Sequence, residues 1–184
     1  PPFALDALSP VLIVFGVAVA GVLVEAFVAR RIRRGVQVTL SLVGVAAALA
    51  ALVWYGVTDG RPILTAGQAI VVDGPTLFIQ GTILILALLS LLVAADRAGE
   101  AGDAFAPQAA AVPGSSLEAR AREAGVTTTE VFPLMLFSLG GMLLMPASHD
   151  LLTMFVALEV LSLPLYLLCG LARRRRMLSQ EASL

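Results

Sequence analysis

The sequence has too few cysteines and histidines to build a disulfide bridge or a metal centre. It contains one Cys (Cys169) and one His (His149) among 184 residues. A disulfide needs a second cysteine, and structural zinc sites use several Cys or His ligands. A disulfide bridge and a structural zinc site therefore cannot be built from this chain alone. We expect any redox centre that it serves to lie on another chain.

Charged residues are also scarce. They make up 14% of the sequence, whereas soluble domains have about 25%. Hydrophobic residues make up 59%, against roughly 45–50% in soluble domains. This composition is typical of a membrane protein. Lysine is absent, so all twelve basic residues are arginines.

Five apolar runs are long enough to cross a bilayer. A crossing needs ~20 residues, and it must be helical because lipid offers the backbone no hydrogen-bond partners. The sequence thus predicts an all-α, polytopic transmembrane helix bundle with five membrane-spanning helices. The basic residues of the first run follow its apolar core, so we interpret it as a retained helix and not as a cleaved signal. The predicted helices cover residues 10–29, 38–57, 75–95, 129–147 and 151–172.

The chain divides into three parts. Residues 1–95 hold three leading helices, 96–126 form a cytoplasmic polar loop, and 127–184 hold helices four and five with a basic cytoplasmic end. The loop is rich in Ala, Gly and Pro, which predicts disorder. Within it, Ser115-x-x-Glu118 predicts a short surface helix.

Three shorter signals mark the ends of the helices. Asp73 precedes Gly74-Pro75, and Thr127-x-x-Glu130 has the pattern of a capping box, so both predict helix starts. Residues 59–72 contain a turn signal and then a β-leaning tail. We expect a short extended segment there.

The arginines predict the orientation of the bundle. Eleven follow helices one, three and five, and one, Arg61, lies in the remaining loops. Short loops rich in Arg stay in the cytoplasm, so we expect an extracytoplasmic N-terminus and a cytoplasmic C-terminal end. Basic runs also bind nucleic acid, but their position beside apolar helices favours a topological role. The eleven are Arg30, Arg31, Arg33, Arg34, Arg97, Arg120, Arg122, Arg173, Arg174, Arg175 and Arg176.

The leading candidate for a functional residue is Glu159, in the middle of the fifth apolar run. A charged side chain at that depth costs about 2.5–3.5 kcal/mol, and intramembrane acids usually have a function. Low dielectric disfavours the carboxylate and a nearby cation favours it, so a moving cation would make Glu159 load and release a proton. No Arg lies inside the five runs, so that cation must come from elsewhere. The alternative is a protonated Glu159 that is hydrogen-bonded to a neighbouring helix.

Pro164 follows that acid by five positions. Its ring cannot donate to the carbonyl of Val160, which predicts a kink and a freed carbonyl directly after Glu159. Water or the hydroxyl of Ser162 could satisfy that carbonyl. Such a hydrated weak point suits a proton path, although prolines also simply bend membrane helices.

Other acids are less specific. Glu25 precedes the first arginine cluster, where it either pairs with an Arg or sits at a proton entrance. Asp73 and Glu130 are explained by helix capping. His149 and Asp150 form the predicted tight turn between helices four and five, and Gly140-Gly141 predicts close helix packing.

The segment from Thr129 to Leu184 resembles the N subunit of bacterial proton-pumping NADH:quinone oxidoreductase, respiratory complex I. The residues that carry the resemblance are Glu130-Val131-Phe132 and then the motifs GGMLL, DLLTMF, LEVLSLPLY and EASL. Upstream, VDGPTLF resembles the start of the third helix of that family. The rest of the first two-thirds matches through hydropathy alone.

This resemblance implies an antiporter-like fold of roughly fourteen helices with two inverted repeats, of which this chain looks like an N-terminal fragment. Glu159 matches the glutamate of the fifth helix, whose partner is a lysine on the seventh. The implied location is the bacterial inner membrane, and the implied partners are the lipid bilayer and the other membrane and peripheral subunits, with no nucleic acid. NADH, flavin mononucleotide, iron–sulfur clusters and quinone belong to the whole complex, with no cofactor in this chain.

Two alternatives remain open at this point. The chain could belong to a standalone multi-subunit cation/proton antiporter, which shares the broad pattern without redox coupling. It could also be a structural or assembly subunit in which Glu159 is merely packed.

Overall fold

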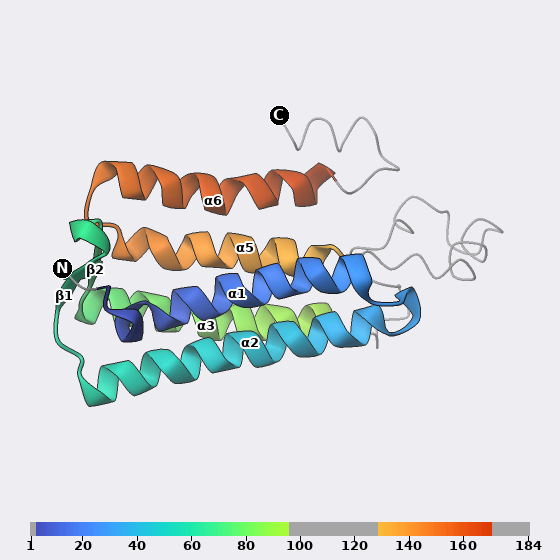
Figure 1. The fold of residues 1–184 in the computed structure, drawn as a ribbon, viewed down its shortest axis with the longest axis horizontal. Helices are drawn as coiled ribbons and strands as arrows, with labels where there is room; N and C mark the ends of the chain where they lie inside the picture. Colours follow the sequence, from blue (N-terminus) through green and yellow to red (C-terminus); the bar gives the residue numbers. More distant parts are fainter. Residues whose placement is uncertain (1–2, 96–128, 171–184) are drawn as a thin grey trace.

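The computed structural model describes residues 3–95 and 129–170, and these form a helical bundle (Figure 1). Five long helices run nearly parallel or antiparallel to one another, which confirms the predicted all-α class. The predicted loop 96–126, its surface helix, Thr127 and the basic end at 173–176 lie outside the described residues. The long helices are α1 (Leu5–Phe27), α2 (Arg30–Thr58), α3 (Gly74–Ala95), α5 (Val131–Leu144) and α6 (Leu151–Gly170).

Four of these helices, α1, α2, α3 and α6, are long and apolar enough to cross a membrane. The fourth predicted crossing is different, because α5 ends at Leu144 and a 3-10 turn, η3 (Met145–Ala147), follows it. Pro146 explains the change, since its ring nitrogen cannot donate the hydrogen bond that would continue the α-helix. Together α5 and η3 are about 27 Å long, close to the thickness of the hydrocarbon layer.

The first arginine cluster lies within α2. We predicted that these arginines would lie between helix one at residues 10–29 and helix two at residues 38–57, but the structure places them in the first turns of the second helix. The helix α1 ends at Phe27, a two-residue extended break follows, and α2 already begins at Arg30. Arginine is a good helix former, so polar residues outside the apolar run still extend the helix.

The helix α1 also begins earlier than its apolar run, at Leu5 instead of residue 10. It passes through Pro10, which cannot donate a backbone hydrogen bond to Asp6. The hydroxyl of Ser9 donates to that carbonyl instead, at 2.7 Å. The helix therefore tolerates a proline in its second turn.

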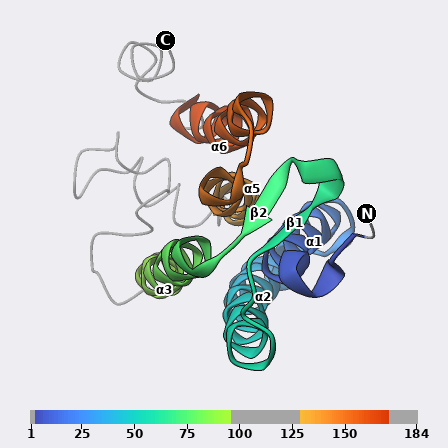
Figure 2. The ribbon, with the colours of Figure 1, turned by 90° about the vertical axis from the view of Figure 1, so that its left-hand side faces the viewer.

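In the bundle, α1 packs against α2 and α5, and α5 lies between α1 and α6 (Figure 2). The helix α3 packs mainly on α2. The apolar core fills the space among α1, α2, α3 and α5, while α6 contacts α5 and the turn before it. Core residues include Val14, Ala18, Val45, Ala48, Leu84, Leu136, Leu139 and Leu143.

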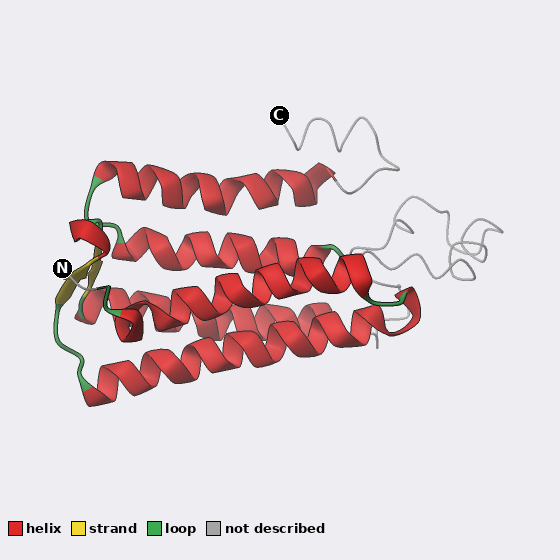
Figure 3. Cartoon of the chain, in the orientation of Figure 1, coloured by secondary structure: helices red, strands yellow, loops and turns green. Residues whose placement is uncertain are grey.

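A small hairpin closes one end of the bundle (Figure 3). Strand β1 (Ile63–Thr65) pairs antiparallel with β2 (Ile70–Val72), which confirms the predicted extended segment. The hydroxyl of Thr65 accepts a hydrogen bond from the backbone N–H of Ala4, and Ile70 forms a bridge with Ser148. The hairpin thus ties the start of α1 to the turn between α5 and α6.

The outer surface of the bundle is apolar. Large hydrophobic side chains are exposed on several helices, among them Trp54, Phe78 and Leu152 at more than two-thirds of their area. Such a surface is unfavourable in water and normal against lipid tails. With the four long apolar helices, it identifies a multi-pass membrane protein.

Candidate functional site

The carboxyl group of Glu159 lies in the middle of α6. The residue as a whole is half-buried, and it lies about 12 Å along the helix from Leu151. Within residues 3–95 and 129–170, the structure shows no ion pair or hydrogen bond to its carboxyl oxygens. The described residues thus do not supply the cation that we expected beside this acid.

The helix α6 continues through Pro164. The hydroxyl of Ser162 donates to the carbonyl of Glu159, at 3.4 Å, and not to the carbonyl of Val160 as one of our two expectations had it. A serine hydroxyl commonly reaches the carbonyl three or four residues earlier in its own helix. Val160 lies only two residues before Ser162, so its carbonyl needs another donor.

The glycine pair of α5 packs as predicted. A Cβ atom on Gly141 would lie 2.5 Å from the backbone nitrogen of Leu161 and 3.0 Å from the carbonyl oxygen of Ala157. A Cβ atom on Gly140 would lie 2.6 Å from the ring of Phe15 on α1. The two glycines thus let α5 approach α6 on one side and α1 on the other.

Glu25 lies in a polar cluster near the opposite end of the bundle from the hairpin. Its carboxylate forms an ion pair with Arg33 at 3.1 Å and accepts a hydrogen bond from the side-chain amide of Gln37 at 2.9 Å. Arg33 also donates to the carbonyl of Val28, after the end of α1. The predicted pairing of Glu25 with an arginine is confirmed, and its role as a proton entrance stays a prediction.

The structure does not bring the two predicted acids together. Glu25 lies on α1, Glu159 lies on α6, and α5 runs between these helices (Figures 1 and 2). A direct proton transfer between them is therefore excluded. Any path that uses both acids must pass through or around α5.

Several buried polar residues were missed by the sequence reasoning. Gln37, Ser41, Gln80 and Ser138 are at most 2% exposed. Each carries an oxygen that has no hydrogen-bond partner in the described residues. Ser41, Gln80 and Ser138 gave a signal, because each is a polar residue inside a predicted apolar run, and Gln37 directly precedes one. The sequence alone did not show which polar residues in such runs are buried against another helix.

Asp73 has the capping role that its position suggested, and Asp150, which we predicted only as part of a turn, caps the start of α6 in the same way. The backbone N–H of Thr76 donates to Asp73 at 2.9 Å, and that of Thr153 donates to Asp150 at 2.7 Å. The bond from the Thr153 backbone and a second one from its hydroxyl lower the pKa of Asp150. Glu130, by contrast, makes no side-chain capping bond at the start of α5.

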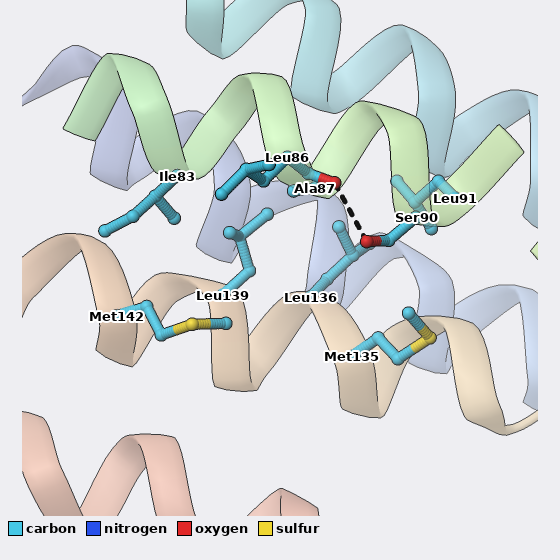
Figure 4. A pocket seen from close by; sticks show the side chains of 9 residues that line it. All are labelled: Ile83, Leu86, Ala87, Ser90, Leu91, Met135, Leu136, Leu139 and Met142. Atoms are coloured by element: carbon cyan, nitrogen blue, oxygen red, sulfur yellow. Dashed lines mark hydrogen bonds between the residues drawn. The ribbon is translucent and has the colours of Figure 1, made fainter. Parts of the chain in front are cut away.

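A pocket of about 260 Å³ lies between α3 and α5 (Figure 4). Its walls are almost entirely apolar, and include Ile83, Leu86, Leu139 and Met142. The one hydroxyl there, on Ser90, donates to the carbonyl of Leu86 in its own helix. The pocket holds no ionisable side chain and is not a candidate for proton transfer.

Comparison with known proteins gives close relatives. No family model matches the chain. It is 59% identical over 96% of its length to NADH-quinone oxidoreductase subunit N of Beutenbergia cavernae. The same subunit is 58% identical over the whole chain in Acidothermus cellulolyticus and 52% identical over 96% of it in Mycobacterium tuberculosis. The chain spans 35–36% of the length of these relatives.

Proposed function

We propose that this chain, which belongs to the family of NADH-quinone oxidoreductase N subunits, is part of an antiporter-like membrane subunit that moves protons in respiratory complex I. In this proposal the subunit couples distant quinone reduction to proton pumping. The redox groups, flavin mononucleotide and iron–sulfur clusters, belong in this proposal to other subunits. One Cys and one His are too few to ligate a cluster within this chain. NADH and quinone likewise react elsewhere.

The observation that carries the proposal is the carboxyl group of the half-buried Glu159 in the middle of an apolar helix. Apolar surroundings disfavour its charged form, and an approaching cation favours it. The family resemblance supplies that cation as a lysine on a later helix. Movement of the lysine toward and away from Glu159 would make the acid release and take up a proton.

We further propose an orientation in the bacterial inner membrane. The first arginine cluster lies where α1 ends and α2 begins. This end of the bundle is opposite the hairpin (Figure 1). Because arginine-rich ends stay in the cytoplasm, the hairpin and the N-terminus face the outside. The partners in this arrangement are lipid and the other subunits of the complex.

The test is Glu159→Gln in the complete complex. Glutamine has a similar size and cannot ionise, so we expect assembly of the complex and a lower ratio of protons moved to NADH oxidised. The ratio is measured in proteoliposomes with a pH-sensitive dye. Glu159→Asp is the matched control, since it keeps the carboxyl group and should retain more pumping than the glutamine variant. An unchanged ratio in Glu159→Gln would favour a structural role.

A further inference from the structure

Ser138 is a buried polar residue of α5 that the proposed mechanism does not use. Its side chain is 1% exposed, and its hydroxyl has no hydrogen-bond partner in the described residues. Buried hydroxyl groups in native proteins are nearly always hydrogen-bonded, either to protein or to ordered water. The hydroxyl of Ser138 therefore needs a hydrogen-bond partner that the described residues do not provide.

The packing of Gly141 shows which helix Ser138 faces. Residues three apart share a face of an α-helix, and the face at Gly141 touches the backbone of α6 at Ala157 and Leu161. The helices α5 and α6 are antiparallel neighbours joined by a short turn (Figure 1). One turn back along α5 is thus one turn forward along α6, so Ser138 lies opposite the turn from Leu161 to Pro164.

That turn of α6 contains the freed carbonyl. Pro164 has no N–H to donate to the oxygen of Val160, and Ser162 donates to Glu159 instead. Pro164 is buried and shares a helical face with Ala157 and Leu161, the residues that meet α5. The carbonyl oxygen of Val160 lacks its helical donor, and the hydroxyl of Ser138 lacks a partner in the described residues. The two groups therefore lie on the surfaces of α6 and α5 that face each other.

We infer that the hydroxyl of Ser138 and the carbonyl oxygen of Val160 hold an ordered water molecule between α5 and α6. The water accepts a hydrogen bond from Ser138 and donates one to Val160, which satisfies both groups. The water thus links α5 and α6 at the turn that follows Glu159. Glu159 is two residues from both Ala157 and Leu161, so its side chain lies on a different face of α6 from the water.

The experiment is structural and independent of pumping. High-resolution electron cryomicroscopy of the assembled complex should show density within hydrogen-bond distance of both Ser138 Oγ and the Val160 carbonyl oxygen. Ser138→Ala and Pro164→Ala should each remove it, because the first lacks the hydroxyl and the second restores the helical N–H. The inference is overturned if the wild-type map shows Ser138 bonded to a carbonyl of α5 and no density between the helices.

The two proposals can fail separately. If the density is present but Glu159→Gln pumps normally, the water site stands and the proposed function fails. If Glu159→Gln stops pumping and the density is absent, the reverse holds.

Discussion

At the scale of single residues, two buried glutamines act as links between helices. Gln37 of α2 donates its side-chain amide to the carbonyl of Gly21 on α1, and Gln80 of α3 donates to the carbonyl of Leu143 on α5, both at 2.8 Å. Lipid contributes no hydrophobic force between helices, so bonds of this kind matter for association. Gln80 is well placed to hold α3 against α5, because it binds a carbonyl near the end of α5, where a 3-10 turn replaces the α-helix.

We predict that Gln80→Leu weakens the packing of α3 on α5. Interhelical hydrogen bonds in membranes contribute about 0.6 kcal/mol on average and up to about 1.7, so the loss should lie in that range. Release of the subunit on heating the purified complex, followed by native electrophoresis, measures it. Thr82→Val is the control, because the hydroxyl of Thr82 is exposed and bonds only within α3. Equal effects of the two variants would contradict the role of Gln80.

The sequence made Glu159 the leading candidate because it stands alone in an apolar run. It offered the pairing of Glu25 as one of two alternatives, because that acid lies next to an arginine cluster. It did not identify Gln37 or Ser138. Their importance depends on which face of a neighbouring helix they meet, and that follows from tertiary packing and not from spacing along the chain.

At the scale of helices, α5 and α6 approach each other closely at Gly141, near the candidate functional site. The backbone of Leu161 lies where a side chain would begin, and backbone cannot move aside as a flexible side chain can. The separation of these two helices is thus set by a single missing methyl group, and so is the position of Glu159 relative to α5.

We predict that Gly141→Ala destabilises the subunit by about 1–3 kcal/mol, the usual cost of overpacking. Gly16→Ala is the matched control, since nothing lies within 4 Å of its added Cβ. Replacing a helical glycine at an open site is favourable by roughly 0.5–1 kcal/mol, so the two variants should shift the thermal midpoint of the complex in opposite directions. A Gly141→Ala variant that is as stable as the wild type would show that α5 and α6 are further apart than described.

Hydropathy predicted the existence and order of the helices, because a run of ~20 apolar residues crosses a membrane as a helix, in which every backbone group is hydrogen-bonded. It did not predict their ends. Arg30 to Arg34 continue a helix beyond its apolar part, and Pro146 stops an α-helix inside an apolar run. In both places local backbone chemistry, and not burial in lipid, decides the boundary.

At the scale of the whole molecule, the bundle has two different ends. The hairpin and the turn at His149 close one end through backbone hydrogen bonds, including one from His149 to Ala69. The other end has the exposed Arg31 and the ion pair of Arg33 with Glu25. This asymmetry is what the proposed orientation rests on.

We predict that cysteines at the two ends of α2 react from opposite sides of the membrane. In a Cys169→Ala background, Thr58→Cys near the hairpin should be labelled in intact cells by a membrane-impermeant maleimide. Gly35→Cys at the arginine-rich end should be labelled only in inverted vesicles. Both positions are exposed, and neither variant alters an arginine. The reverse pattern would invert the proposed topology.

The place of α1 between α2 and α5 also governs how the bundle is made. The ribosome completes α2 directly after α1, so these two helices can pair in the membrane as soon as both have emerged. The second neighbour of α1 is synthesised roughly a hundred residues later. Until then the flank of α1 that carries Phe15 and Gly21 lacks the helix that covers it in the folded bundle, so the packing around α1 is completed only when α5 has been made.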